Sequence, residues 1–289
     1  MLDNAEKIRM LNGLDIFCFK SDFISNEICR FGVYEKELYL FLKKFLEINK
    51  DAVCLDVGAN IGNHTLTMGL YAKKTYAFEP VPEIFKVLSR NINENKLNKK
   101  VKLCNFGLSN NDQILDIAIE RSGNIGGSGI VNSVVQSRDS KYEIQQIQVK
   151  TGDETVQKYS INRVDFIKMD IEGHETEAIL GLKETIQKFR PVMCIEWNCD
   201  KVRDGFKNHD IFNNIFKGYE FKTLCVSDPR DWFAKSYFTR WMYYCFPKLL
   251  RYKIFKRKYF VSEFDRSKDY CCVLMFPKEK ESEVMNSLV

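Results

Sequence analysis

The sequence predicts an α/β protein with a doubly wound, mostly parallel β-sheet. Residues 52–80 read as a buried strand, a glycine turn, a helix and a second strand. Residues 164–197 again give an apolar strand, a helix and an apolar strand, an alternation typical of parallel sheets covered by helices. A chain of 289 residues with 45% hydrophobic and 29% charged content can bury one large core with attachments.

The first 50 residues are predicted to lead into this sheet. The runs 15–20 and 28–33 are β-prone and predict a hairpin or lead-in strands. In residues 34–48 the apolar positions follow helical spacing, which predicts an amphipathic helix laid on the core. The run Gly32–Glu35 lies at the start of this helix.

The central unit begins with residues 53–57, an apolar run of the kind that a central parallel strand needs. Gly58 and Gly62 then bracket a turn in which a ligand can approach the backbone. The predicted caps of the following helix are Asn63 or Thr65. The next strand ends in Glu79, 21 positions after Gly58, where an acid usually accepts hydrogen bonds from a ribose.

The charge of the turn indicates which nucleoside it binds. A dinucleotide turn has three glycines and no acid at its entrance, because a pyrophosphate must lie on bare amides. Here Asn60 takes the middle position and Asp56 stands at the strand end, so phosphates are repelled and an ammonium or sulfonium group is attracted. S-adenosylmethionine has both groups, has a ribose and has no phosphate. The alternative is a turn with a purely structural role.

Segments after Glu79 are predicted to lie near the same edge of the sheet. Residues 82–94 predict a helix with proline in its first turn, and residues 101–104 predict the third strand. Because ligands collect at the carboxyl ends of strands, Asn105 and Phe106 are placed to touch an adenine. An ordinary turn is the alternative there.

A glycine-rich run, residues 123–129, lies between two further predicted strands, residues 115–119 and 144–149. Glycine loops that bind phosphate lie between a strand and a helix, and these glycines do not, so the run is not predicted to bind phosphate. We expect a flexible connector or, as the alternative, a lid on the substrate side.

Titratable side chains gather after the apolar strand predicted for residues 164–169. They are Asp170, Glu172, His174 and Glu175. A helix continues to Phe189, and a fifth strand, residues 192–197, has Glu196 near its end. One or two acids would complement the dipole at a helix start, but three acids and a histidine around a glycine exceed what capping requires.

A basic and aromatic segment lies between the last two predicted strands, residues 219–226 and 270–276. From Phe233 to Val261 it has eight basic residues and no acid. Three interpretations stay open for it: a lid or a contact between two copies of the chain, an interfacial contact with an anionic membrane that suits lipid-linked glycans, and a nucleic-acid surface.

The ten cysteines form no C-x-x-C pair and no cysteine–histidine cluster. We therefore expect free thiols without a disulfide framework, no metal site, and a reducing compartment. No apolar run approaches the ~18 residues of a membrane span, and no signal pattern precedes the first strand. The expected location is the cytoplasm, with peripheral membrane contact through residues 233–261 as an addition.

Three motifs together resemble the FkbM family of S-adenosylmethionine-dependent methyltransferases. They are Gly32–Glu35, Asp56–Gly62 (DVGANIG) and Asp170–Glu175 (DIEGHE). The resemblance covers roughly residues 30–200 and implies a Rossmann-like, seven-stranded sheet with an antiparallel last strand, and O-methylation of sugars and natural products. His174 departs from the small residue that is more usual in the family, and residues 227–268 have no counterpart.

The resemblance also implies a set of cofactor contacts. The methionine part would be held by Glu35, Asp56, Gly58, Ala59 and Asn60, and the ribose by Glu79. The chain would then divide into four parts: a lead-in (1–50), a Rossmann-like cofactor-binding core (51–226), a basic aromatic insertion (227–268), and the last core strand with a charged tail (269–289).

Methyl transfer to an oxygen requires alignment and removal of the hydroxyl proton. We predict that Asp170 lies nearest the methyl group and that Glu172 or His174 accepts the proton. The predicted function is O-methylation of a sugar, glycan or glycolipid-like acceptor. A nucleic-acid methyltransferase is less favoured. An enzyme of that kind that methylates amino groups would be expected to have an acid or asparagine followed by two prolines after the fourth strand, and no prolines follow Asp170 there. A cofactor-binding module without catalysis is the other alternative, and a homo-oligomer is compatible with each of these.

Overall fold

The computed structural model describes residues 5–19, 23–120, 129–130, 142–226 and 259–288. Its centre is an eight-stranded mixed sheet. In spatial order the strands are β13 (Tyr259–Glu263), β12 (Tyr219–Val226), β14 (Tyr270–Pro277), β11 (Val192–Trp197), β10 (Phe166–Met169), β3 (Val53–Val57), β4 (Lys74–Phe78) and β5 (Val101–Cys104). The strands from β11 to β5 run parallel, and β14 runs antiparallel to both neighbours. The α/β class and the antiparallel last strand are confirmed, and β13 makes one strand more than the predicted seven.

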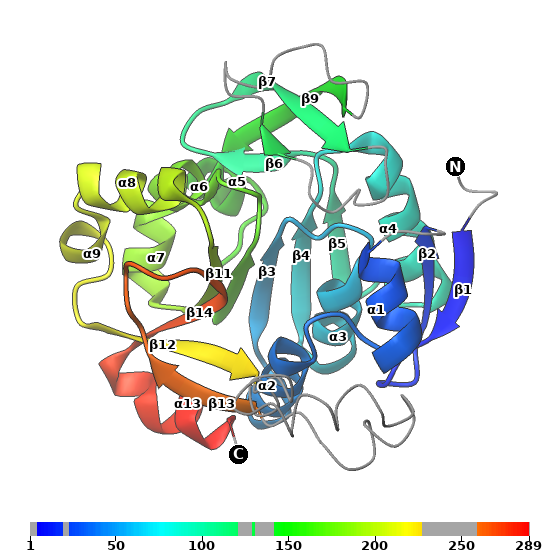
Figure 1. The fold of residues 1–289 in the computed structure, drawn as a ribbon, viewed down its shortest axis with the longest axis horizontal. Helices are drawn as coiled ribbons and strands as arrows, with labels where there is room; N and C mark the ends of the chain where they lie inside the picture. Colours follow the sequence, from blue (N-terminus) through cyan, green and yellow to red (C-terminus); the bar gives the residue numbers. More distant parts are fainter. Residues whose placement is uncertain (1–4, 20–22, 121–128, 131–141, 227–258, 289) are drawn as a thin grey trace, which may run out of the picture.

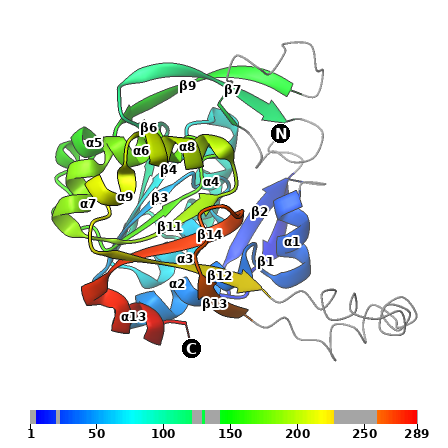
Figure 2. The same cartoon turned by 60° about the vertical axis from the view of Figure 1, so that its left-hand side comes forward.

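Helices cover both faces of the central sheet (Figure 2). On one face α2 (Lys36–Ile48), α13 (Glu281–Asn286) and residues of α3 (Asn63–Tyr71) pack on side chains such as Cys54 and Phe166. Alternate side chains such as Leu55 and Ile167 face another layer of helices. Its members are α5 (Gly152–Lys158), α6 (Glu175–Gly181), α7 (Lys183–Phe189), α8 (Asp200–Asn208) and α9 (Ile211–Asn214). This burial on both faces explains why the central strands are apolar throughout.

Two smaller β elements flank the central sheet (Figure 1). A four-stranded sheet lies across one end of it, in the order β6 (Gly107–Ser109), β9 (Tyr142–Thr151), β7 (Gln113–Glu120) and β8 (Gly129–Ile130). The other element is a hairpin that packs beside α4 (Pro82–Glu94). It comprises β1 (Ala5–Arg9) and β2 (Asp15–Phe19), and α1 (Phe23–Phe31) follows it. A 3-10 turn, η3 (Lys278–Lys280), precedes α13.

The chain reverses its direction of travel through the sheet between β3 and β10. From β3 it continues outward to β4 and β5, whereas from β10 it continues to β11 on the other side. In open α/β sheets, such a reversal leaves a crevice at the carboxyl ends of the two strands, where ligands bind. The glycine turn after β3 and the acidic cluster after β10 therefore lie side by side.

The predicted elements agree with the structure in most places, and α4 begins at Pro82 and ends at Glu94 as predicted. The strand predicted for residues 28–33 is wrong, because residues 23–31 form α1, in which Ile24 and Ile28 lie one helical turn apart. The helix predicted up to Phe189 is divided between α6 and α7. Strand β1 was not predicted.

The cysteines differ from expectation at one pair. The structure joins Cys194 on β11 to Cys272 on β14 by a disulfide, so the expectation of free thiols is wrong there. The two strands are antiparallel neighbours, but 78 residues separate the cysteines, and no local spacing signals the contact.

Some predictions concern residues outside the described part of the chain. These are the glycine-rich run up to residue 128 and the basic segment up to residue 258. Within the described ranges, no helix has both the length and the apolar character needed to cross a membrane.

Asn91 on α4 provides a test of how the hairpin is attached. Its side chain is fully buried, accepts a hydrogen bond from the Phe17 backbone N–H (2.6 Å), and donates to the carbonyls of Phe17 (3.1 Å) and Ile61 (2.7 Å). Asn91→Ala should lower the free energy of unfolding by roughly 2–4 kcal/mol, because it leaves buried backbone groups without partners. Urea unfolding measures this loss. Asn93→Ala, an exposed position on the same helix, is the control and should change stability by less than about 0.5 kcal/mol; equal effects would contradict the assignment.

Candidate functional site

Two cavities open at the crevice between β3 and β10, and they share Gly58, Asn60, Asp170 and Glu172. The Glu79 cavity is bounded by Glu79 and by side chains of β7 and β9. The Lys168 cavity is bounded by Lys168, α1 and the start of α3. The glycine turn thus stands between two binding spaces that meet at the acidic cluster.

The glycine turn is held by the two strands that flank it. The backbone N–H groups of Gly58 and Ala59 donate to the carbonyl of Phe78 at the end of β4 (3.1 and 2.9 Å). Gly58 has φ +83°, and a Cβ there would overlap the carbonyl oxygen of Asp170. Only glycine permits both this conformation and this approach. Asn60 also has a positive φ (50°), and Ala59 lines the Lys168 cavity.

Glu79, the residue for which the sequence predicts a ribose contact, lines the Glu79 cavity. It is buried, its Oε2 accepts from the Asn60 N–H (3.0 Å), and its Oε1 accepts from the Val81 N–H (2.9 Å). Burial raises the pKa of Glu79 to about 7, against the opposing effect of these two donors. The walls beside it are largely apolar, formed by Val81, Ile84, Leu108, Ile117, Ile147 and Val149.

The predicted adenine contacts lie just outside this cavity. The Asn105 amide donates to the carbonyls of Glu79 (2.9 Å) and Pro80 (3.2 Å), and the Phe106 ring packs edge-on against Phe78. Among the described residues of this segment, Gly107 and Leu108 line the cavity, while Asn105 and Phe106 do not.

Asp56 lies beneath the turn and lines neither of the two cavities described. It is fully buried, and its Oδ2 accepts a hydrogen bond from the Thr65 hydroxyl (2.5 Å). Its Oδ1 has no partner among the described residues. The predicted capping of α3 by Thr65 or Asn63 is wrong, because Gly62 is the N-cap and makes no side-chain bond.

Glu35 contacts α3 rather than either cavity. Its Oε2 lies 2.9 Å from Nε2 of His64, and the two side chains are 9% and 5% exposed. Asn63 exchanges hydrogen bonds with the backbone N–H and carbonyl of Tyr34 (3.1 and 3.0 Å). The Gly32–Glu35 motif is therefore fastened to the start of α3, and its Tyr34 lines the Lys168 cavity. The sequence did not single out His64 or Tyr34 as site residues.

Asp170 and Glu172 occupy the boundary between the cavities. Partial burial, with Asp170 and Glu175 nearby, raises the pKa of Glu172 to about 7. Its side chain is open to solvent, which screens part of this effect. Burial, with the same carboxylates, raises the pKa of Glu196 on β11 to about 10. Oxygens of Asp170, Glu172 and Glu196 approach one another within 4.8 Å; acids at this spacing are common without an ion, and we assign them none.

The remaining members of the predicted cluster are more enclosed. Nε2 of His174 lies 2.9 Å from the Ser109 hydroxyl, and burial lowers the pKa of His174 to about 4. The ring lines the Glu79 cavity as a neutral imidazole at neutral pH. Glu175 is buried, accepts from the Ile171 N–H (2.9 Å), and lines neither of the two cavities described, so its place is structural.

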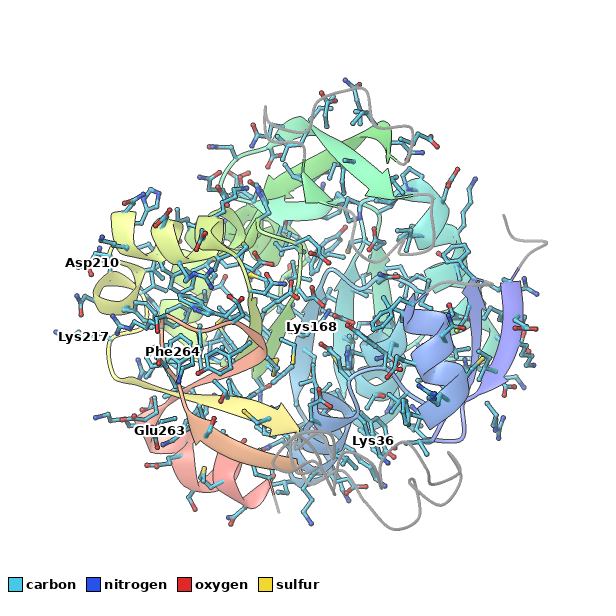
Figure 3. The ribbon with its side chains drawn as sticks, in the orientation of Figure 1. Lys36, Lys168, Asp210, Lys217, Glu263 and Phe264 are labelled. Carbon is cyan, nitrogen blue, oxygen red and sulfur yellow. A yellow bond between two sulfur atoms is a disulfide. The ribbon has the colours of Figure 1, made fainter. Side chains whose placement is uncertain are left out.

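Lys168 is a site residue that the sequence did not indicate. It lies on β10 near the centre of the molecule (Figure 3), and its Nζ contacts Asp170 Oδ2 and the Gly58 carbonyl, each at 3.2 Å. Burial alone would lower the pKa of Lys168, but Asp170, Asp56 and Glu35 raise it above its usual range. Within the described chain, no other lysine or arginine lines either cavity. The only indication of this residue in the sequence is that a charged side chain lies inside an otherwise apolar strand, Phe166–Met169 (FIKM).

The close approach at Gly58 can be tested against a matched glycine. Gly13 in the β1–β2 hairpin has nearly the same φ (+82°), but a Cβ there would meet nothing nearer than 4.0 Å. Both alanine variants carry the backbone strain, and only Gly58→Ala also forces the Asp170 carbonyl away. We expect Gly58→Ala to lower the free energy of unfolding by about 2 kcal/mol more than Gly13→Ala. Chemical denaturation measures the difference, and equal losses would show that the contact is not tight.

Comparisons with known proteins find a family domain and several relatives. The methyltransferase FkbM domain matches residues 56–222. The hexuronic acid methyltransferase AglP of Haloferax volcanii is 33% identical over 141 residues, which are 49% of this chain and 54% of AglP. The methyltransferase sdnD of Sordaria araneosa is 27% identical over 183 residues, 52% of this chain and 68% of sdnD. The matched part thus spans about half the length of AglP.

Solved structures that resemble this chain include the methyltransferase FkbM from Methylobacillus flagellatus KT. It is 16% identical, with a TM-score of 0.46, and the match covers 78% of this chain and 44% of that one. An O-methyltransferase from Bacillus cereus is 11% identical, with a TM-score of 0.45 and coverage of 84% and 80%. Because the family domain matches more than half of the residues, the chain belongs to the FkbM methyltransferase family.

Proposed function

We propose that the protein is an S-adenosylmethionine-dependent O-methyltransferase whose acceptor is a hydroxyl of a sugar, glycan or glycolipid-like molecule. The observation that carries this proposal is the meeting of two cavities at Asp170 and Glu172. One cavity has the acid and apolar walls that suit a nucleoside. The other opens beside the same two carboxyl groups, where a second molecule can approach.

The Glu79 cavity fits the adenosine part of the cofactor. Each Glu79 oxygen accepts one backbone N–H and has a further lone pair for a ribose hydroxyl. Apolar side chains such as Ile84 and Leu108 suit the faces of an adenine. S-adenosylmethionine supplies a methyl group that its sulfonium has already activated. The turn at Gly58 and Asn60 would hold the region between the nucleoside and the methionine part.

Glu172 is the better candidate to accept the hydroxyl proton. It lines both cavities, is open to solvent, and has a pKa of about 7, near the value at which a general base is most effective. His174 is less suited, because its Nε2 is engaged by Ser109 and its pKa is lowered to about 4. Asp170 is paired with Lys168 and would face the sulfonium instead.

The Lys168 cavity suits a polyhydroxylated acceptor. Phe23 and Tyr34 offer ring surfaces, and Glu172 and Glu196 offer carboxyl groups for hydroxyl hydrogen bonds. The relative AglP is named for hexuronic acid, which places a sugar among the first acceptors to test.

An acceptor screen tests this function. The purified protein is incubated with S-adenosylmethionine carrying a ¹³C-methyl group and with a methyl hexuronide, a neutral methyl hexoside or a short RNA. We expect an added labelled methyl group on a sugar, stable to mild alkali, as an ether is. An alkali-labile product would be a methyl ester and would contradict transfer to a hydroxyl. Labelled RNA, or cofactor binding without transfer to any acceptor, would favour the alternative functions.

Glu172→Gln tests the proton acceptor. Activity of the wild type should rise with pH through about 7, because the carboxylate form accepts the proton and the acid form cannot. The variant should lose this rise and about 10²-fold in kcat, with cofactor affinity little changed. Glu184→Gln, an exposed acid on α7, is the matched control. Unchanged kcat and pH profile in Glu172→Gln would assign the role to another group.

A further inference from the structure

Lys168 occupies an unusual electrostatic position in the site. Carboxyl groups face it from several elements: Asp56 on β3, Asp170 after β10, and Glu35 before α2. Glu172 and Glu196 line the same cavity, and Asp170 is among the groups that raise the pKa of Glu175. Of the described residues, it alone brings a lysine or arginine charge to the walls of either cavity. Its side chain is 7% exposed, so solvent screens its interactions weakly.

The strand register places the ammonium group between the two halves of the crevice. Lys168 pairs with Asp56 across β10 and β3, and both side chains point to the same face of the sheet. Gly58 and Asp170 follow two positions after Asp56 and Lys168, and each comes directly after the end of its strand. One ammonium group therefore reaches the carbonyl of the first residue of the turn and the carboxylate at the head of the acidic cluster, each at 3.2 Å.

We propose that Lys168 is a positioning residue for the methyl transfer. Its ammonium group holds the Asp170 carboxyl group at the boundary of the two cavities, and it binds the Gly58 carbonyl at the start of the turn. This inference rests on the proposed function, because it assigns Asp170 to the sulfonium side of the boundary. Lys168 itself takes no proton from the acceptor and does not touch the reacting atoms.

The competing explanation is a buried ion pair that serves stability alone. A stabilising pair would affect unfolding and would weaken all ligands of the cavity alike. A positioning cation has a further consequence, because the Asp170 carboxyl group loses the ammonium group beside it when Lys168 is replaced. A ligand with a positive sulfur responds to the position of that carboxyl group, whereas its neutral thioether counterpart does so only weakly.

The experiment measures the dissociation constants of S-adenosylmethionine and S-adenosylhomocysteine by calorimetry at neutral pH and compares their ratio between proteins. The proteins compared are the wild type, Lys168→Met, Lys168→Arg and the control Lys222→Met. Lys222 is also a strand lysine paired with an acid, Glu263, but it lies on β12 and lines neither of the two cavities described. Melting temperatures recorded in parallel separate loss of fold from loss of binding.

We expect the ratio of the two dissociation constants to change by about 10-fold in Lys168→Met, because only S-adenosylmethionine has a charged sulfur. Lys168→Arg, which keeps the charge, should return the wild-type ratio, and Lys222→Met should equal the wild type. A wild-type ratio in folded Lys168→Met would overturn the proposal and leave a structural role only.

A second variant decides the matter if Lys168→Met does not fold. Asp170→Asn removes the carboxylate that Lys168 is proposed to hold, so it should also change the ratio of the two dissociation constants. A wild-type ratio in Asp170→Asn would overturn the proposal. If the wild type binds both ligands but methylates no hydroxyl, only the proposed acceptor fails; if it binds neither ligand, the proposed function fails at the cofactor.

Discussion

The contact between Gly58 and the Asp170 carbonyl is the constraint on which the site depends. The two residues follow neighbouring parallel strands, and the backbone N–H of Asp170 donates to the carbonyl of Val57 (3.1 Å). A side chain at position 58 would separate the strand ends, since its Cβ would overlap the Asp170 carbonyl. With glycine there, the turn after β3 and the acidic cluster after β10 become one surface, and the two cavities share it.

Charge is distributed unevenly over this surface. Burial raises the pKa of Glu79, Glu172 and Glu175 to about 7, and that of Glu196 to about 10. These carboxyl groups hold their protons more readily than an exposed acid does, because ionising several of them together in a desolvated crevice is unfavourable. Asp170 has a neighbour of opposite charge, because the Lys168 ammonium group lies 3.2 Å from its Oδ2. Among the described residues that line the two cavities, the boundary thus has one lysine beside several carboxyl groups.

Local patterns were sufficient to predict much of this arrangement. The apolar run 53–57, the glycines that follow it and the proline at position 82 predicted the β–turn–α–β unit, and residues 170–175 predicted the cluster. Contacts set by strand register or by distant packing were not predictable. The pairing of Glu35 with His64 joins the Gly32–Glu35 motif to α3, and neither segment alone indicates this contact. Lys168 looked like one polar position in a buried strand, and its role depends on Asp56 lying opposite it on β3. Likewise, the cavity wall begins at Gly107 rather than Asn105 because the Asn105 amide turns back to the Glu79 carbonyl.

A crystal structure of the protein with S-adenosylhomocysteine tests the central claim most directly. The account predicts that the adenosine lies in the Glu79 cavity, with ribose hydroxyls within hydrogen-bond distance of the Glu79 carboxylate. It also predicts that the sulfur lies at the boundary formed by Gly58, Asp170 and Glu172, so that the Lys168 cavity stays open for an acceptor. A nucleoside bound away from Glu79, or a ligand that fills the Lys168 cavity with its adenine, would contradict the division of the site into a cofactor half and an acceptor half.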